Sequence, residues 1–189
     1  MAFSLALLGA STYEKPALGS YDLLSTQILT SNTASVTFAS LGTFAADYEH
    51  LQLRISARSN QAETFGSMNI RLNGDSASNY TRHELSGNGS SVASGAATTQ
   101  TSMTFHIQIV GANAAANEFG ANVSDFLDPF NASKNTTVRT LGGRTSSPRI
   151  NLHSGLWMNT ASITSIELIT NSGSVITGSR FSLYGLRKV

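Results

Sequence analysis

Residues 69–91 read NIRLNGDSASNYTRHELSGNGSS, with glycine turns at Asn73-Gly74-Asp75 and Gly87-Asn88-Gly89 on either side of a strand-like segment. In a phosphate-binding loop, the glycines lead into a helix N-terminus, often through Gly-Lys-Ser or Gly-Lys-Thr. Here strand-like sequence surrounds the glycines, and no such triplet follows them. The stretch therefore predicts two turns around a strand.

The same stretch contains three residues that could be taken for a hydrolytic or metal-binding group: Asp75, His83 and Glu84. Neighbouring residues of a strand point to opposite faces of the sheet. His83 and Glu84 therefore cannot both ligate one ion from the same face. We expect no catalytic and no metal site here.

Alternation of apolar and polar residues continues on both sides of this stretch, and it is strict at His50–Arg58, Ser67–Asn73 and Ser102–Val110. A period of two places one face of a strand in a core and the other toward solvent. In the third segment this pattern puts His106 on the polar side. Weaker patterns predict further strands at Asp22–Thr30, Ala34–Ala39, Tyr80–Leu85, Asn122–Leu127, Thr136–Leu141, Ile150–Met158, Ile163–Ile169 and Phe181–Leu186.

The composition agrees with an all-β fold. Charged residues make up 12% of the 189 residues, about half the usual share in globular proteins. Ser, Thr, Asn and Gly are abundant, and these residues suit tight turns between short strands. We predict an antiparallel β-sandwich, jelly-roll-like, with an extended N-terminal arm.

We expect two parts of the chain, an arm over residues 1–20 and a single sandwich domain over residues 21–189. The apolar run at the start lacks a positive flank and is too short to span a bilayer, which argues against a signal peptide or membrane anchor. We interpret it as an arm that docks on a partner. Its candidate assembly anchor consists of Phe3, Leu5, Leu7 and Leu8.

Charge and cysteine content exclude several classes of partner and site. The net charge is +1 without a basic block, so nucleic acid is not an expected partner. The chain has no cysteine, which excludes disulfides and thiolate metal sites. The four histidines lie far apart, outside any metal-ligand spacing, and we expect them at the surface or at an interface. We predict no cofactor.

Catalytic motifs do not appear in the sequence. There is no Gly-x-Ser-x-Gly elbow of a serine hydrolase. A carboxylate pair for glycoside hydrolysis needs only to meet in space, so the sequence leaves that alternative open, although the chain has just 11 acidic residues. We predict that the protein is not an enzyme.

Candidate recognition residues lie in two places. The polar run Gly87–Thr101 is expected to be a long exposed loop, and such loops commonly carry recognition. The only tryptophan, Trp157, is expected to anchor the core, and the alternative is a platform on which a sugar stacks. The candidate recognition loop is Asn88, Ser90 and Ser91 together with Trp157.

Three segments together resemble a family of small structural proteins of tailed bacteriophages. They are LNGDSASNY (72–80) followed by GNGSS (87–91), SGLWMNTASITSI (154–166) and FSLYGL (181–186), and the resemblance covers roughly residues 24–189. The resemblance implies a virion protein without catalytic residues. It does not distinguish capsid decoration from tail-fibre or receptor-binding modules, and the arm is peculiar to this chain.

The first functional hypothesis is a capsid cement or decoration protein that stabilises the phage head through its arm and sandwich contacts. Its partners would be the major capsid protein and other copies of the chain. The alternative is a tail-fibre or receptor-binding adhesin that joins tail proteins and recognises a host surface glycan. We expect a homo-oligomer, specifically a trimer, located in the virion.

Overall fold

A computed structural model describes residues 21–188. The arm and its candidate anchor, Phe3, Leu5, Leu7 and Leu8, lie outside the described residues. One short 3-10 helix, η1 (Leu41–Phe44), accompanies the strands. The strands are β1 (Tyr21–Ile28), β2 (Ser35–Phe38), β3 (Tyr48–Ala57), β4 (Phe65–Leu72), β5 (Tyr80–Gly87), β6 (Val92–Gln100), β7 (Met103–Val110), β8 (Gly120–Leu127), β9 (Thr136–Arg144), β10 (Arg149–Trp157), β11 (Ile166–Thr170) and β12 (Arg180–Arg187).

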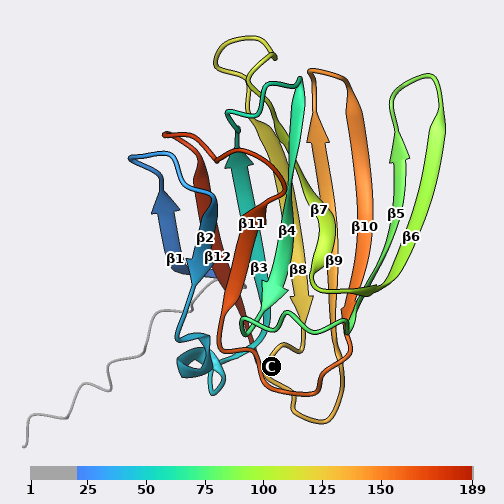
Figure 1. The fold of residues 1–189 in the computed structure, drawn as a ribbon. Coiled ribbons are helices and arrows are strands. Elements are labelled where there is room, and N and C mark those ends of the chain that lie inside the picture. Colours follow the sequence, from blue (N-terminus) through green and yellow to red (C-terminus); the bar gives the residue numbers. More distant parts are fainter. Residues whose placement is uncertain (1–20, 189) are drawn as a thin grey trace, which may run out of the picture.

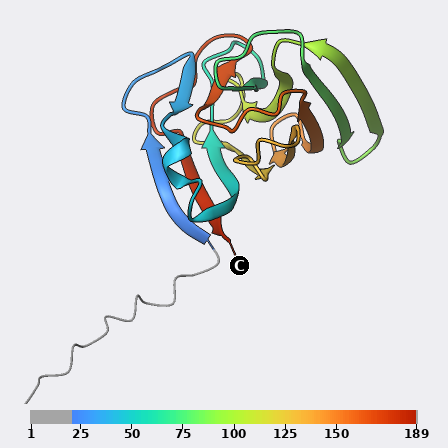
Figure 2. The same ribbon diagram turned by 90° about the horizontal axis from the view of Figure 1, so that it is seen from below.

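Two antiparallel sheets pack face to face, which confirms the predicted all-β sandwich (Figure 1). The larger sheet has eight strands in the order β1-β12-β3-β8-β9-β10-β5-β6. The smaller sheet has four strands in the order β2-β11-β4-β7. The hairpin β5–β6 projects from the rest of the molecule at one end of the large sheet (Figure 2).

The core lies between the sheets and is built from the inward faces of the alternating strands. β3, inside the large sheet, contributes Leu51, Leu53 and Ile55, all of which are buried. β4, inside the small sheet, contributes Met68 and Ile70 from the opposite side. Burial of such side chains stabilises the fold by roughly 1.5–3 kcal/mol each.

The expectation that Gly87–Thr101 is a loop is wrong, because Val92–Gln100 forms the edge strand β6. β6 pairs with β5 from Gly87↔Val92 to Tyr80↔Gln100. Apart from Val92, its side chains are small or polar and mostly exposed, since it lies on the projecting hairpin. No face of β6 needs apolar residues, so the strand leaves no alternating pattern in the sequence.

A bulge in β7 overturns the alternation predicted for that strand. Met68 pairs with Ile107 and Ile70 pairs with Met103, so β7 has two more residues than β4 over this interval. Phe105 lies within it at φ 53°. A bulge turns the following side chains to a new direction. His106 consequently points into the core, and Phe105 is exposed.

The free edge of β7 is closed by a side chain from the other sheet. The Asn122 amide on β8 donates to the Gln108 carbonyl oxygen at 2.8 Å and accepts from the Gln108 N–H at 3.2 Å. A buried amide thus replaces the neighbouring strand that the edge lacks, and it satisfies backbone groups that would be costly to leave unpaired. Gly142 on β9 leaves room for it, because a Cβ there would collide with the Asn122 amide.

Candidate functional site

The residues of the opening stretch form a structural network. Asn73 and Gly74 adopt φ of 54° and 67° in the turn between β4 and β5. The Asp75 carboxylate accepts hydrogen bonds from the Ala77 N–H at 2.9 Å, Asn79 Nδ2 at 2.7 Å and Trp157 Nε1 at 2.8 Å. These donors, with Asn79 the largest contributor, lower the pKa of Asp75. Asp75 therefore holds the turn as an anion.

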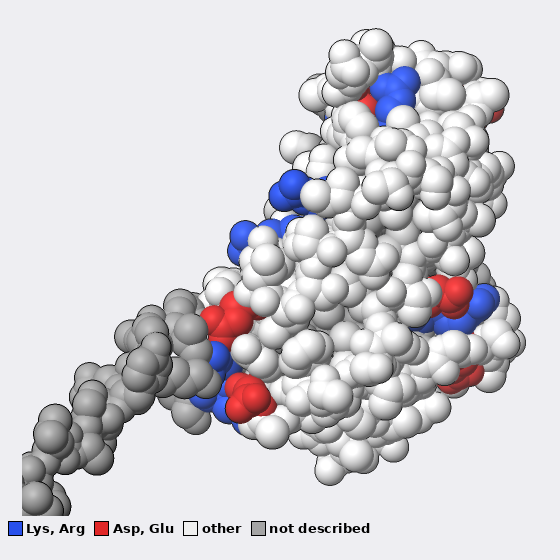
Figure 3. Space-filling view, turned by 90° about the vertical axis from the view of Figure 1, so that its left-hand side faces the viewer, with Lys and Arg blue, Asp and Glu red and all other residues white. Residues whose placement is uncertain are grey.

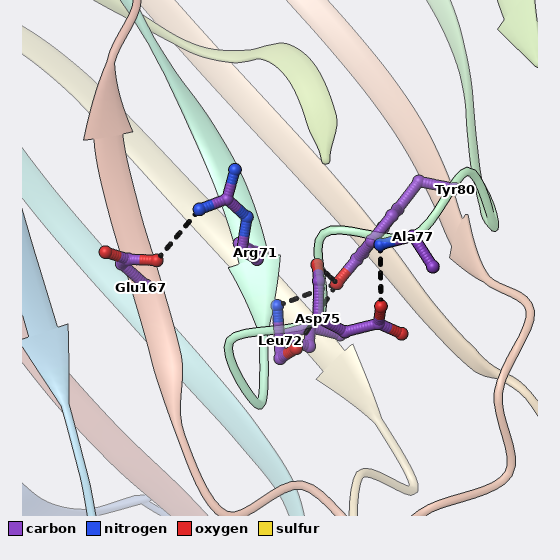
Figure 4. Close-up of polar contacts among 6 residues, drawn as sticks. All are labelled: Arg71, Leu72, Asp75, Ala77, Tyr80 and Glu167. Carbon is purple, nitrogen blue, oxygen red and sulfur yellow. Dashed lines mark hydrogen bonds and ion pairs between the residues drawn. The ribbon is translucent and has the colours of Figure 1, made fainter. Parts of the chain in front are cut away.

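Tyr80 ties the same turn to the core (Figure 4). Its hydroxyl accepts from the Leu72 N–H at 3.1 Å and lies 3.0 Å from the carbonyl oxygen of Asp75. Its ring stacks on Trp157 with centroids 6.3 Å apart. Burial raises the pKa of Tyr80 to about 12. The two turns and the strand predicted from the sequence are confirmed.

Two charged residues of β5 pair with one another on the same face. Arg82 Nη1 lies 2.6 Å from Glu84 Oε2, and Arg82 Nε donates to Thr104 Oγ1 at 2.9 Å. His83, between the pair in sequence, is exposed. This arrangement agrees with the expectation that His83 and Glu84 face opposite sides.

The structure does not bring the candidate recognition residues together. Asn88, Ser90 and Ser91 lie exposed in the β5–β6 turn, where Asn88 Oδ1 accepts from the N–H groups of both serines. Trp157 is at the far end of β10, since Ile150 pairs with Gly87 and Trp157 pairs with Tyr80. Trp157 is 1% exposed, so the sugar-platform alternative is wrong and Trp157 belongs to the core.

Two histidines contradict the expectation that all four lie at the surface or at an interface. His106 on β7 and His153 on β10 are both fully buried between the sheets, with ring centroids 5.3 Å apart. Burial lowers the pKa of His106 to about 3 and that of His153 to about 4. Both imidazoles are therefore neutral at neutral pH. The alternation did not predict this, because the β7 bulge reverses the direction of His106 and because β10 buries polar residues, His153 among them.

The outer face of the large sheet carries an exposed apolar patch across β5, β6, β8, β9 and β10. Leu152 pairs with Leu85 on one side and with Leu141 on the other, and Leu141 pairs with Val123. Ile150 is 66% exposed and Leu141 57%. The outer apolar patch, as we call it, consists of Leu85, Val92, Val123, Leu141, Ile150 and Leu152.

Two shallow hollows flank Ile150 within this patch and share Ala121 and Gly143. The first has a volume of about 570 Å³ and is bordered by Arg54 and Arg180. The second has a volume of about 700 Å³ and reaches Arg144, Arg149, Asn88 and Gly89. Apolar surface with arginines at its rim is a common composition of protein interfaces.

A surface group where β3 begins and β8 ends could be taken for a cation site. Ligand atoms of Glu49, His50 and Asp128 lie within 4.8 Å of one another. However, Lys134 already pairs with Asp128, and His50 Nδ1 accepts the Asp128 N–H at 3.0 Å. These contacts already explain why the three side chains lie close together, so we do not propose a cation site here.

The surface is sparsely charged. On the side drawn in Figure 3, charged side chains form a few separate groups on an otherwise uncharged surface. Over residues 21–188, no helix is long and apolar enough to cross a membrane. The chain matches no protein-family model, and a search of curated proteins finds no similar sequence.

Proposed function

We propose that this chain is a non-enzymatic structural protein of the tailed-bacteriophage virion, a capsid cement or decoration subunit that attaches through its outer apolar patch and its N-terminal arm. The observation that supports the proposal is the inverted polarity of β8, β9 and β10. These strands bury Asn122, Thr140 and His153 and expose Val123, Leu141 and Leu152. A sheet with this polarity is suited to a partner on its outer face.

The energetics favour a protein as that partner. Contiguous exposed apolar patches on soluble proteins mark interaction sites. Covering one large aliphatic side chain contributes roughly 1.5–3 kcal/mol before the cost of association. A capsid repeats such a contact many times by symmetry, so a modest patch suffices when several contacts act together.

The alternative, a tail-fibre or receptor-binding adhesin, is supported by the second hollow. This hollow is bordered by Asn88 and Gly89 of the β5–β6 turn, next to the exposed hydroxyls of Ser90 and Ser91. Arg149 lies on its other side. Hydrogen-bonding groups around an apolar floor could hold a sugar, so this hollow is where a host glycan would bind.

The copy number of the chain per virion separates the two functions. Quantitative mass spectrometry would compare this chain with the major capsid protein in purified particles. A cement protein is expected at on the order of hundreds of copies, because icosahedral symmetry supplies that many sites. A count of a few to tens would favour the adhesin, and absence from virions would overturn both.

Attachment to particles tests the surface directly. The double variant Leu141→Ser with Leu152→Ser should fold normally, because both side chains are exposed, but lose binding to capsids. Leu23→Ser with Ile28→Ser is the matched control, since these residues are similarly exposed on the edge strand β1. Equal attachment of both double variants would remove the patch from the proposal. Deletion of residues 1–20 tests the arm separately, and undiminished attachment would contradict its role as an anchor.

A further inference from the structure

Three side chains with donor atoms for a soft metal converge between the two sheets. Met103 and His106 come from β7, and His153 comes from β10. All three are completely buried. Within residues 21–188, neither ring nitrogen of His106 and neither of His153 has a hydrogen-bond partner.

Local backbone structure brings the three together. The β7 bulge places Met103 and His106 on the same side, although they are three residues apart. Gly155 provides the space, because a Cβ there would lie 2.6 Å from Met103 Sδ and 3.0 Å from His106 Cε1. His153 precedes Gly155 by two residues and therefore projects from the same face of β10.

The unpartnered nitrogens require an explanation. Buried polar side-chain atoms nearly always have a partner, and leaving one without a partner costs about 1–3 kcal/mol. Four such atoms are concentrated in this one imidazole pair. A neutral imidazole carries a free lone pair on one of its two ring nitrogens. A neutral imidazole is the form that binds a metal ion.

Ring geometry is compatible with a shared ion. The two rings are not stacked but tilted at 45°. A centroid separation of 5.3 Å is short enough for the two rings to share an ion that lies about 2.0–2.1 Å from one nitrogen of each.

The donor set and the nearby charges select the ion. We propose that Met103, His106 and His153 bind one copper(I) ion. Thioether sulfur with imidazole is a soft donor set, which favours copper(I) over harder divalent ions. Arg82 and Glu84 lie on β5 opposite Gly155 and His153, and they neutralise one another at 2.6 Å. A single positive charge is less costly to bury beside them than a double one.

The test is a copper(I) titration of the full, metal-free chain under anaerobic reducing conditions, in competition with bicinchoninate. We expect one equivalent to bind and the thermal midpoint to rise. His106→Leu and His153→Leu should each lower the affinity by at least about 100-fold, because losing a ligand exceeds the 10–100-fold effect of residues that merely orient ligands. His83→Leu, an exposed histidine of β5, is the control and should bind as the wild type does.

Two titration results would overturn the proposal: no copper(I) retained against the competitor, or undiminished binding by either leucine variant. The variants should fold, since leucine removes unpartnered polar atoms from the core. If one does not, X-ray absorption of the copper-loaded wild type decides, with two nitrogen ligands and one sulfur expected from Met103. Coordination without sulfur, or tighter stoichiometric binding of zinc(II), would refute the assignment. This inference is independent of the proposed virion function.

Discussion

Replacement of Asp75 tests whether the opening stretch is structural. Its carboxylate accepts from the Ala77 N–H, Asn79 Nδ2 and the indole N–H of Trp157. Hydrogen bonds to a charged acceptor contribute about 1.5–3 kcal/mol, and a buried donor without a partner costs about 1–3 kcal/mol. Because the carboxylate is partly exposed, we expect Asp75→Ala to lower the free energy of unfolding by about 2–4 kcal/mol. Asp75→Asn keeps an oxygen for the indole and should cost about 1 kcal/mol.

Urea unfolding followed by circular dichroism and by the fluorescence of Trp157, the only tryptophan, measures both variants. The pKa of Asp75 is lower in the folded state, so its stabilisation is present above the unfolded pKa and is lost as pH falls through the folded pKa. The difference between wild type and Asp75→Asn should therefore shrink in acid. An alanine variant within about 0.5 kcal/mol of wild type would refute the reasoning, as would equal losses for Ala and Asn.

Two further predictions concern the contacts between β8 and β9. Gly142→Ala should push the Asn122 amide off the β7 edge and lower the free energy of unfolding by about 1–3 kcal/mol. Gly143→Ala is the control and should cost less, because its Cβ would be 3.6 Å from its nearest neighbour. Equal losses of stability in thermal unfolding would contradict this prediction. Ser124 and Thr140 share a buried hydrogen bond of 2.7 Å. Thr140→Val alone should lower the free energy of unfolding by about 1–2 kcal/mol, because it leaves the Ser124 hydroxyl buried without a partner. The double variant with Ser124→Ala removes both hydroxyls and should change the stability less. A double variant that loses more than the single one in urea unfolding would show that the hydroxyl pair itself is stabilising.

Strict alternation was sufficient to identify the strands that have one apolar and one polar face. β3 and β4 were found because their inner residues, such as Leu53 and Ile70, are aliphatic and their outer ones are polar. The glycine turns beside Asp75 were found because Asn-Gly sequences adopt positive φ. β6 was missed because neither of its faces is buried, so no hydrophobic pattern marks it.

The candidate sites were harder to find, because they depend on features that a period of two does not describe. A bulge turns His106 inward, and its neighbour His153 comes from a strand more than forty residues later. Trp157 was expected in the core, but its hydrogen bond to Asp75 joins segments far apart in the sequence. The outer apolar patch becomes visible only when the register aligns one or two residues from each of five strands.

The register of β8, β9 and β10 is itself evidence about the environment of the sheet. A shift by one residue would bring Val123, Leu141 and Leu152 inside and turn the buried polar residues outward. The observed register instead buries Trp157, and it places the Asn122 amide on the β7 edge. These contacts fix the register, and they leave aliphatic side chains in water. A chain that keeps such a face exposed is stabilised further when a partner covers it, and this supports our proposal that the sheet assembles on a larger particle.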